Sequence, residues 1–128
     1  MEKLIPENQL EEYLSNLLND NFKFIDFFRF FLTAKVYIPS ASEIKLDGTG
    51  FSPLVFNKNE VEMIGIFTSK NRTCLYSEKF PYCLSIQGKE AIKRIQSSSG
   101  LVLNPGYDQG FDISPEGLSK IIGDFSIG

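Results

Sequence analysis

Two polar segments of the sequence combine residue types that could bind an anion or a small polar ligand. The first is Phe67-Thr68-Ser69-Lys70, where two hydroxyls follow an apolar stretch and precede a short helix predicted at 70–76. Free backbone N–H groups and the helix dipole favour a carboxylate or phosphate at such a position. The alternative is an ordinary helix cap, in which a hydroxyl of Thr68 or Ser69 accepts a hydrogen bond from the helix itself.

The second segment is Asn104-Pro105-Gly106-Tyr107-Asp108, which follows a short apolar strand predicted at 101–103. Ligands of open α/β sheets bind beyond the ends of such strands. We therefore expect Asn104 to join Thr68 and Ser69 in one ligand site if the two preceding strands are parallel neighbours. Tyr107 and Asp108 are expected to be exposed and to bind a partner. The alternative is a rigid turn that only redirects the chain.

The residues for catalysis and metal binding are sparse. Histidine is absent, which removes the usual general base and the commonest metal ligand. Cys74 and Cys83 have no metal-ligand spacing, and we interpret both as reduced, small, buried side chains. Glu60 and Glu62 share one face of a strand but have no third ligand. We therefore predict no catalytic residue, no metal site and no cofactor, and we do not expect an enzyme.

Composition and charge restrict the partners. A chain of 128 residues is predicted to form one domain, 1–128. Its net charge of −3 and its pI of about 5.0 argue against nucleic acid, because phosphate contacts need a concentrated positive surface. The sequence has no apolar run of membrane-spanning length, and its first residues do not resemble a signal peptide. We expect a cytoplasmic protein that does not bind a membrane.

The strongest structural signal is the segment 22–32, which holds six of the twelve phenylalanines. Four of them follow the spacing of one helix face, at i, i+3, i+4 and i+7: Phe24, Phe27, Phe28 and Phe31. Further apolar residues on its other faces predict a helix that is buried on several sides. A preceding amphipathic helix, at about 7–19, is expected to pack against it.

Strand and helix patterns alternate along the rest of the chain. Strands are predicted at 35–38, 53–56, 61–67, 82–86, 101–103 and 111–113, and helices at 70–76, at 89–96 and after the capping residue Ser114. This order predicts an α+β fold, similar to α/β. A single mixed sheet should be flanked by helices, with the two N-terminal helices packed on it.

The order of four short pieces resembles a known family. They are Thr33-Ala34-Lys35-Val36-Tyr37-Ile38-Pro39, Ile66-Phe67-Thr68-Ser69, Gly100-Leu101-Val102-Leu103-Asn104-Pro105-Gly106 and Phe111-Asp112-Ile113-Ser114-Pro115-Glu116. Over about residues 8–125 the chain is similar to the N-terminal domain of the SseB family, named for enhanced serine sensitivity. The resemblance implies the fold and brings no catalytic residues. One departure is Arg72, because the family often has an acid at this position of a capping box.

Two classes of function remain open. The first is a non-catalytic, cytoplasmic protein-interaction or regulatory module of the SseB type, which binds another protein and could also form a homo-oligomer. The alternative is a sensor of a small anion or amino acid that uses Thr68, Ser69 and Asn104. The sensor requires a concave site where these residues meet. The interaction module requires exposed apolar side chains, among which Tyr107 is the expected centre.

Overall fold

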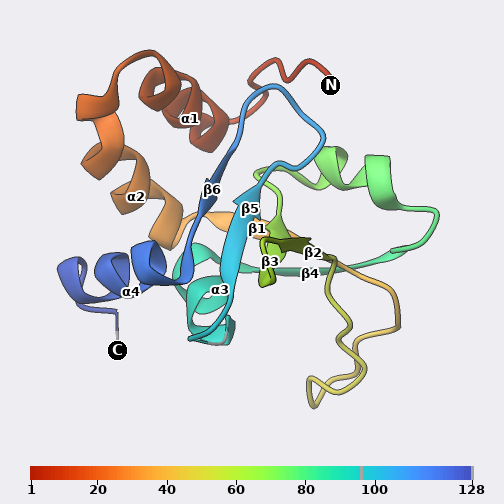
Figure 1. Ribbon diagram of the computed structural model, residues 1–128. Coiled ribbons are helices and arrows are strands. Elements are labelled where there is room, and N and C mark those ends of the chain that lie inside the picture. Colours follow the sequence, from red (N-terminus) through yellow and green to blue (C-terminus); the bar gives the residue numbers. More distant parts are fainter. Residues whose placement is uncertain (96, 128) are drawn as a thin grey trace.

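The computed structural model describes residues 1–95 and 97–127, and its helices and strands alternate in the predicted order (Figure 1). The helices are α1 (Gln9–Asn19), the 3-10 helix η1 (Asn21–Lys23), α2 (Phe24–Thr33), the 3-10 helix η2 (Lys70–Tyr76), α3 (Gly88–Arg94) and α4 (Pro115–Asp124). The strands are β1 (Lys35–Ser40), β2 (Val55–Lys58), β3 (Val61–Ile66), β4 (Tyr82–Gln87), β5 (Gly100–Leu103) and β6 (Phe111–Ile113). The α+β class is confirmed, and Gln96 of the predicted helix 89–96 lies outside the described residues.

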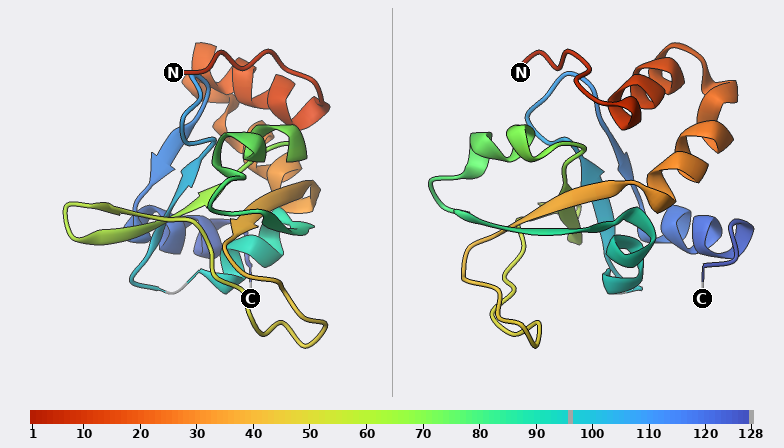
Figure 2. Two further views of the ribbon diagram at one scale, coloured as in Figure 1. Left: turned by 90° about the vertical axis from the view of Figure 1, so that its right-hand side faces the viewer. Right: turned by 180° about the vertical axis from the view of Figure 1, so that it is seen from behind.

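The strands form two sheets, where the sequence analysis predicted one. A four-stranded sheet has the order β2-β3-β5-β6, and within it only β3 and β5 are parallel. Strands β1 and β4 form a separate antiparallel ribbon that crosses the four-stranded sheet (Figure 2). Isolated bridges join β1 to the chain at two places: Ser40 pairs with Pro53, ahead of β2, and Tyr37 pairs with Phe67, just beyond β3. Because β1 makes only these bridges and no continuous ladder with β2 or β3, the predicted single sheet is divided.

Local chemistry explains where the elements begin and turn. Strand β2 begins two residues later than predicted, at Val55, after Pro53, which has no N–H for a strand ladder. The β2–β3 hairpin turns at Asn59 and Glu60, and both have positive φ angles, of 51° and 67°. Two such residues in a row give a hairpin turn whose twist matches its strands. Ser114 caps α4 by accepting a hydrogen bond of 3.0 Å from the Gly117 N–H.

The C-terminal turns of α2 form the centre of the core. Phe27, Phe28 and Phe31 are buried, and the rings of Phe27 and Phe28 meet edge to face at 5.0 Å. Phe111 of β6 packs against Phe27 at 5.7 Å, which places α2 on the sheet. Aromatic pairs of this geometry add to the gain from burial. The predicted core position of Phe27 and Phe28 is confirmed.

The first turn of α2 departs from the prediction of a helix buried on several sides. Phe24 and Ile25 remain 42% and 52% exposed, and Phe22 in the adjoining η1 is 95% exposed. Helix α1 covers the opposite face of α2, where Tyr13 stacks on Phe30 at 4.9 Å. Burial therefore depends on where the neighbouring elements end, and not only on the helical spacing of the phenylalanines.

We predict that Phe27→Ala or Phe28→Ala lowers the free energy of unfolding by ~3–5 kcal/mol, because each change removes a buried ring and leaves a cavity. Phe22→Ala is the matched control and should change it by less than ~0.5 kcal/mol, since its ring lies in water. Urea denaturation followed by circular dichroism measures all three. Equal losses for Phe27 and Phe22 would contradict this description of the core.

Candidate functional site

The two polar segments singled out in the sequence meet at one end of the four-stranded sheet. Strands β3 and β5 are parallel neighbours, with Ile66 opposite Leu103, so the residues that follow them emerge side by side. The Thr68 N–H donates to Asn104 Oδ1 at 3.0 Å. In return, Asn104 Nδ2 donates to the Thr68 hydroxyl at 3.0 Å. The expected meeting of Thr68 with Asn104 is confirmed.

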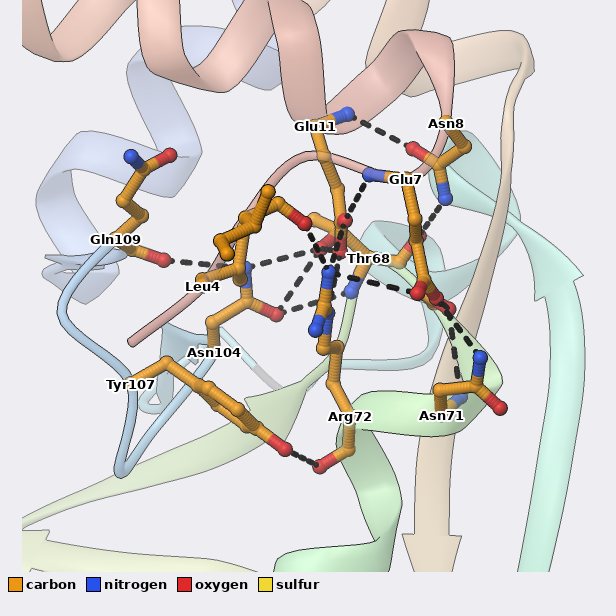
Figure 3. A network of polar contacts seen from close by, with 12 residues as sticks. Leu4, Glu7, Asn8, Glu11, Thr68, Asn71, Arg72, Asn104, Tyr107 and Gln109 are labelled. Atoms are coloured by element: carbon orange, nitrogen blue, oxygen red, sulfur yellow. Dashed lines mark hydrogen bonds and ion pairs between the residues drawn. The ribbon is translucent and has the colours of Figure 1, made fainter. Parts of the chain in front are cut away.

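An anion does occupy this position, and it belongs to the chain itself (Figure 3). It is the carboxylate of Glu11, on α1, which is fully buried. Its Oε2 accepts a hydrogen bond of 2.6 Å from the Thr68 hydroxyl. Arg72 of η2 donates twice, from Nη2 to Oε1 at 2.7 Å and from Nε to Oε2 at 3.0 Å. Two N–H···O contacts from one guanidinium fix the orientation of the carboxylate and strengthen the ion pair.

A second carboxylate, that of Glu7, lies against the start of η2. It accepts hydrogen bonds from the Ser69 hydroxyl and, at 3.1 Å, from the side-chain amide of Asn71. Its other oxygen is 3.6 Å from Arg72 Nη2. Ser69 also caps η2 by accepting a hydrogen bond of 3.3 Å from the Asn71 N–H. The helix-cap alternative for Ser69 is therefore confirmed.

The sequence before α1 explains how Glu11 reaches this place. Asn8 is the N-cap of α1: its Oδ1 accepts a hydrogen bond of 2.8 Å from the Glu11 N–H. Its Nδ2 donates to the Thr68 carbonyl at 3.0 Å, which ties the cap to the end of β3. Glu11 then accepts a hydrogen bond of 3.1 Å from the Glu7 N–H. The spacing Asn8-x-x-Glu11 is that of a capping box, and this signal could have indicated a role for Glu11.

The hydrogen bonds within this cluster favour the charged forms of Glu11 and Arg72. Burial acts to raise the pKa of Glu11, but hydrogen bonds from Arg72, Thr68 and the Glu7 N–H outweigh it and leave the pKa below its ordinary value. The hydrogen bond to Glu11 likewise raises the pKa of Arg72. Both groups are therefore charged at neutral pH. The hydroxyls of Thr68 and Ser69, which the sequence analysis assigned to an external ligand, already donate to carboxylates of the chain.

The expectation that Tyr107 is an exposed contact residue is wrong. Tyr107 is only 7% exposed, and its ring packs edge to face on Phe67 at 6.4 Å. Its hydroxyl donates to the Arg72 carbonyl at 2.9 Å, and the Arg72 guanidinium lies 5.8 Å from its ring centre. Burial is the main cause that raises the pKa of Tyr107 to about 12. The ring therefore belongs to a core cluster, together with Leu4 and Leu54.

Tyr107 is buried because the N-terminal segment lies across its loop. Glu2 pairs with Tyr107 in a parallel bridge, and the Glu2 N–H donates to the Gly106 carbonyl at 2.9 Å. Asp108 is exposed as expected, but its Oδ1 accepts a hydrogen bond of 2.8 Å from the Leu4 N–H. Sequence reasoning assigned no element to residues 1–6, and their pattern gave no sign of this contact.

The turn itself has the geometry that its sequence favours. Asn104 and Gly106 have positive φ angles, of 53° and 87°. Glycine adopts such angles without strain, and asparagine tolerates them better than most residues. The Cβ of any other residue at position 106 would approach a methyl carbon of Leu75 to 3.0 Å. The rigid-turn alternative is therefore confirmed, together with the contact to Thr68.

A cleft that the sequence analysis did not foresee lies elsewhere, between α2 and α4. Its volume is about 1020 Å³, and it is also lined by β6, the strand that runs beside α2 and leads into α4 (Figure 1). Phe24 and Ile25 form one wall, and Ile121 and Phe125 contribute apolar surface to the other. Helical spacing assigned Phe24 and Ile25 to the core, and the sequence carries no signal that their end of α2 remains uncovered.

Three further features concern metal ligands, cysteines and membrane-spanning helices. Residues 1–95 and 97–127 contain no group of three or more His, Cys, Asp or Glu side chains that could hold a metal ion. Cys74 and Cys83 are free thiols, but Cys74 is exposed and Cys83 only half-buried, contrary to the expectation that both are buried. Within the same residues no helix has the length and apolar character needed to cross a bilayer.

These observations define a small α+β domain whose N-terminal helix is fixed to the end of a parallel strand pair by a buried ion pair. The family model described as "SseB protein N-terminal domain" matches residues 10–120. The chain belongs to the SseB family. Comparisons with curated proteins and with solved structures give no match.

Glu11→Gln should lower the free energy of unfolding by about 3 kcal/mol at neutral pH, because it leaves the charge of Arg72 without its partner. The folded-state pKa of Glu11 lies below its ordinary value of 4.5, so its charge stabilises the fold above that value. This contribution is lost as the pH falls through the folded-state pKa. The loss of stability in acid should therefore be smaller in Glu11→Gln than in the wild type.

The control for this prediction is Glu12→Gln, which changes the adjacent, exposed carboxylate of α1. Its stability should follow the wild type at every pH. Chemical denaturation at a series of pH values gives the three curves. The assignment is contradicted if Glu11→Gln and Glu12→Gln lose stability in parallel as the solution is acidified.

Tyr107→Ala should lower the free energy of unfolding by ~3 kcal/mol, because the change empties a buried aromatic position. Tyr107→Phe should cost only ~1 kcal/mol, the loss of one hydrogen bond to the Arg72 carbonyl. Tyr82→Ala is the control for loss of an exposed tyrosine ring. Thermal or urea unfolding distinguishes them, and a stable Tyr107→Ala protein would restore the interpretation of Tyr107 as a surface residue.

Proposed function

We propose that this chain is a non-catalytic, cytoplasmic protein-interaction module of the SseB type, which makes its contact through the cleft between α2 and α4. The occupant is a protein surface that presents large apolar side chains and charges of both signs. The observation that carries the proposal is the exposure of Leu18, Phe24 and Ile25, three large apolar side chains that line this cleft. Contiguous apolar patches on a soluble protein are a mark of interaction sites.

The lining of the cleft supports a protein over a small polar ligand. Its walls are mostly apolar side chains contributed by helices, which is typical of grooves that receive side chains of a partner. Arg29 on α2 and Lys120 on α4 stand at its edge with Asp124. Charges at the rim of an apolar contact select the partner and its orientation.

The alternative, a sensor of a small anion at Thr68, Ser69 and Asn104, receives no support from the geometry. Glu11 and Glu7 already accept the hydrogen bonds that an external carboxylate or phosphate would need. An added anion would also have to displace Glu11 from Arg72, to which it is bound by two hydrogen bonds. Breaking a buried ion pair of this kind costs several kcal/mol.

The experiment compares proteins captured from a lysate of the native organism by the wild type, by Ile25→Asp and by Leu46→Asp. Ile25 lies in the cleft wall and in the first turn of α2, where an acid is compatible with the helix dipole. Leu46 is equally apolar and fully exposed, but it lies in the β1–β2 loop on the side of the molecule away from α2 (Figure 1).

We expect Ile25→Asp to lose at least ~90% of one or more proteins that the wild type and Leu46→Asp both retain, because a charge would be buried in the contact. Quantitative mass spectrometry measures the amounts, and thermal melting checks that each variant is folded. Identical captured sets for all three folded proteins would refute the proposal.

A further inference from the structure

We infer that the cleft between α2 and α4 receives a second copy of this chain, with Phe22 of each copy inserted into the cleft of the other. This inference rests on the proposed function, because it names a partner for the same surface. It extends that proposal by assigning Phe22, whose ring touches little of its own chain, as the residue that anchors the contact.

Phe22 projects from the corner between α1 and α2. It belongs to the three-residue helix η1, and its backbone is held there by a hydrogen bond of 3.0 Å from its N–H to Asp20 Oδ1. Its side chain is 95% exposed. Asn21, the residue before Phe22, and Phe24, two residues after it, line the cleft. A fixed backbone thus holds a large aromatic ring in water directly beside an apolar hollow.

A two-fold symmetric contact can form when one surface patch carries both a projecting side chain and a hollow that receives it. In such a contact the same patch is used by both copies, so a side chain that enters the partner's hollow is matched by the partner's side chain entering its own. Phe22 is the projection, and the wall formed by Phe24 and Ile25 is part of the hollow. Fully desolvated aromatic anchors in pockets contribute most of the affinity in protein contacts.

The exposed apolar area is sufficient to centre such an interface. Four side chains at this corner are at least 42% exposed: Leu18, Phe22, Phe24 and Ile25. Covering them would remove roughly 400 Å² of apolar surface from each copy, since an aromatic residue buries about 150–250 Å². A stable interface takes roughly 800 Å² from each partner. The rest of that area would come from the remaining cleft walls and from the surface around the cleft.

The charges around the cleft also fit a second copy. Arg29, Lys120 and Asp124 form no ion pair with any residue among 1–95 and 97–127. A patch that bears both signs can pair with itself when it is turned by 180°, so that bases of one copy face acids of the other. A strongly acidic or strongly basic partner would leave one of the two signs opposed by a like charge.

The test is the mass of the purified full chain in solution, measured by sedimentation at concentrations up to ~1 mM. At that concentration about half of the chains are paired even if the Kd of the dimer is ~1 mM. The average mass of the wild type should rise with concentration from the monomer mass of 14.5 kDa toward twice that value. Phe22→Asp should weaken the association at least ~10-fold in Kd, as expected for loss of a central aromatic anchor. Leu46→Asp, the matched change of an exposed apolar residue away from the cleft, should associate as the wild type does.

A wild type that stays monomeric up to ~1 mM overturns the inference. A dimer that survives Phe22→Asp unchanged, or one that Leu46→Asp weakens equally, also overturns it. These outcomes are separate from the fate of the proposed function. Loss of captured proteins in Ile25→Asp with a monomeric wild type would sustain the interaction module and reject the second copy. A dimer that Phe22→Asp weakens, with identical captured sets, would sustain the second copy and reject other protein partners.

Discussion

The buried carboxylate of Glu11 imposes the strictest constraint on this fold. A carboxylate taken out of water destabilises the folded state by several kcal/mol unless it is paired and fully hydrogen bonded. Its donors come from η2, from the end of β3 and from the backbone before α1, and these parts lie far apart in the sequence. They must therefore assemble together. That assembly also holds the N-terminal segment over the loop containing Tyr107, where Leu4 and Phe67 complete the second core cluster.

The same buried ion pair also limits which parts of the surface can bind a ligand or a partner. The end of the parallel strands is the usual place for a ligand in α/β sheets. Here the hydroxyls of Thr68 and Ser69 already donate hydrogen bonds to carboxylates of the chain itself. The apolar cleft beside α2 is open, and its rim bears charges of both signs. The polar cluster therefore acts in stability, while the apolar cleft is the surface on which the proposed protein contacts are based.

Apart from the meeting of Thr68 with Asn104, the features predicted correctly are those set by local chemistry or by strong periodicity. The order of elements, the cap at Ser69 and the burial of Phe27 and Phe28 follow from neighbouring residues. The errors concern contacts between distant segments. Glu11 and Arg72 are 61 residues apart, and neither has a partner within its own helix that would reveal the pair. Spacing also cannot distinguish Phe24 from Phe28, because their exposure depends on which elements cover each end of α2.

The central claim is that Glu11 and Arg72 act as one unit that fixes α1 to the sheet. A double-mutant cycle with Glu11→Gln, Arg72→Met and the combined variant tests it most directly, with unfolding free energies from urea denaturation at neutral pH. The account predicts a coupling energy of at least ~1.5 kcal/mol, because residues within one hydrogen-bonded ion pair are not independent. Additive effects, with a coupling below ~0.5 kcal/mol, would contradict it.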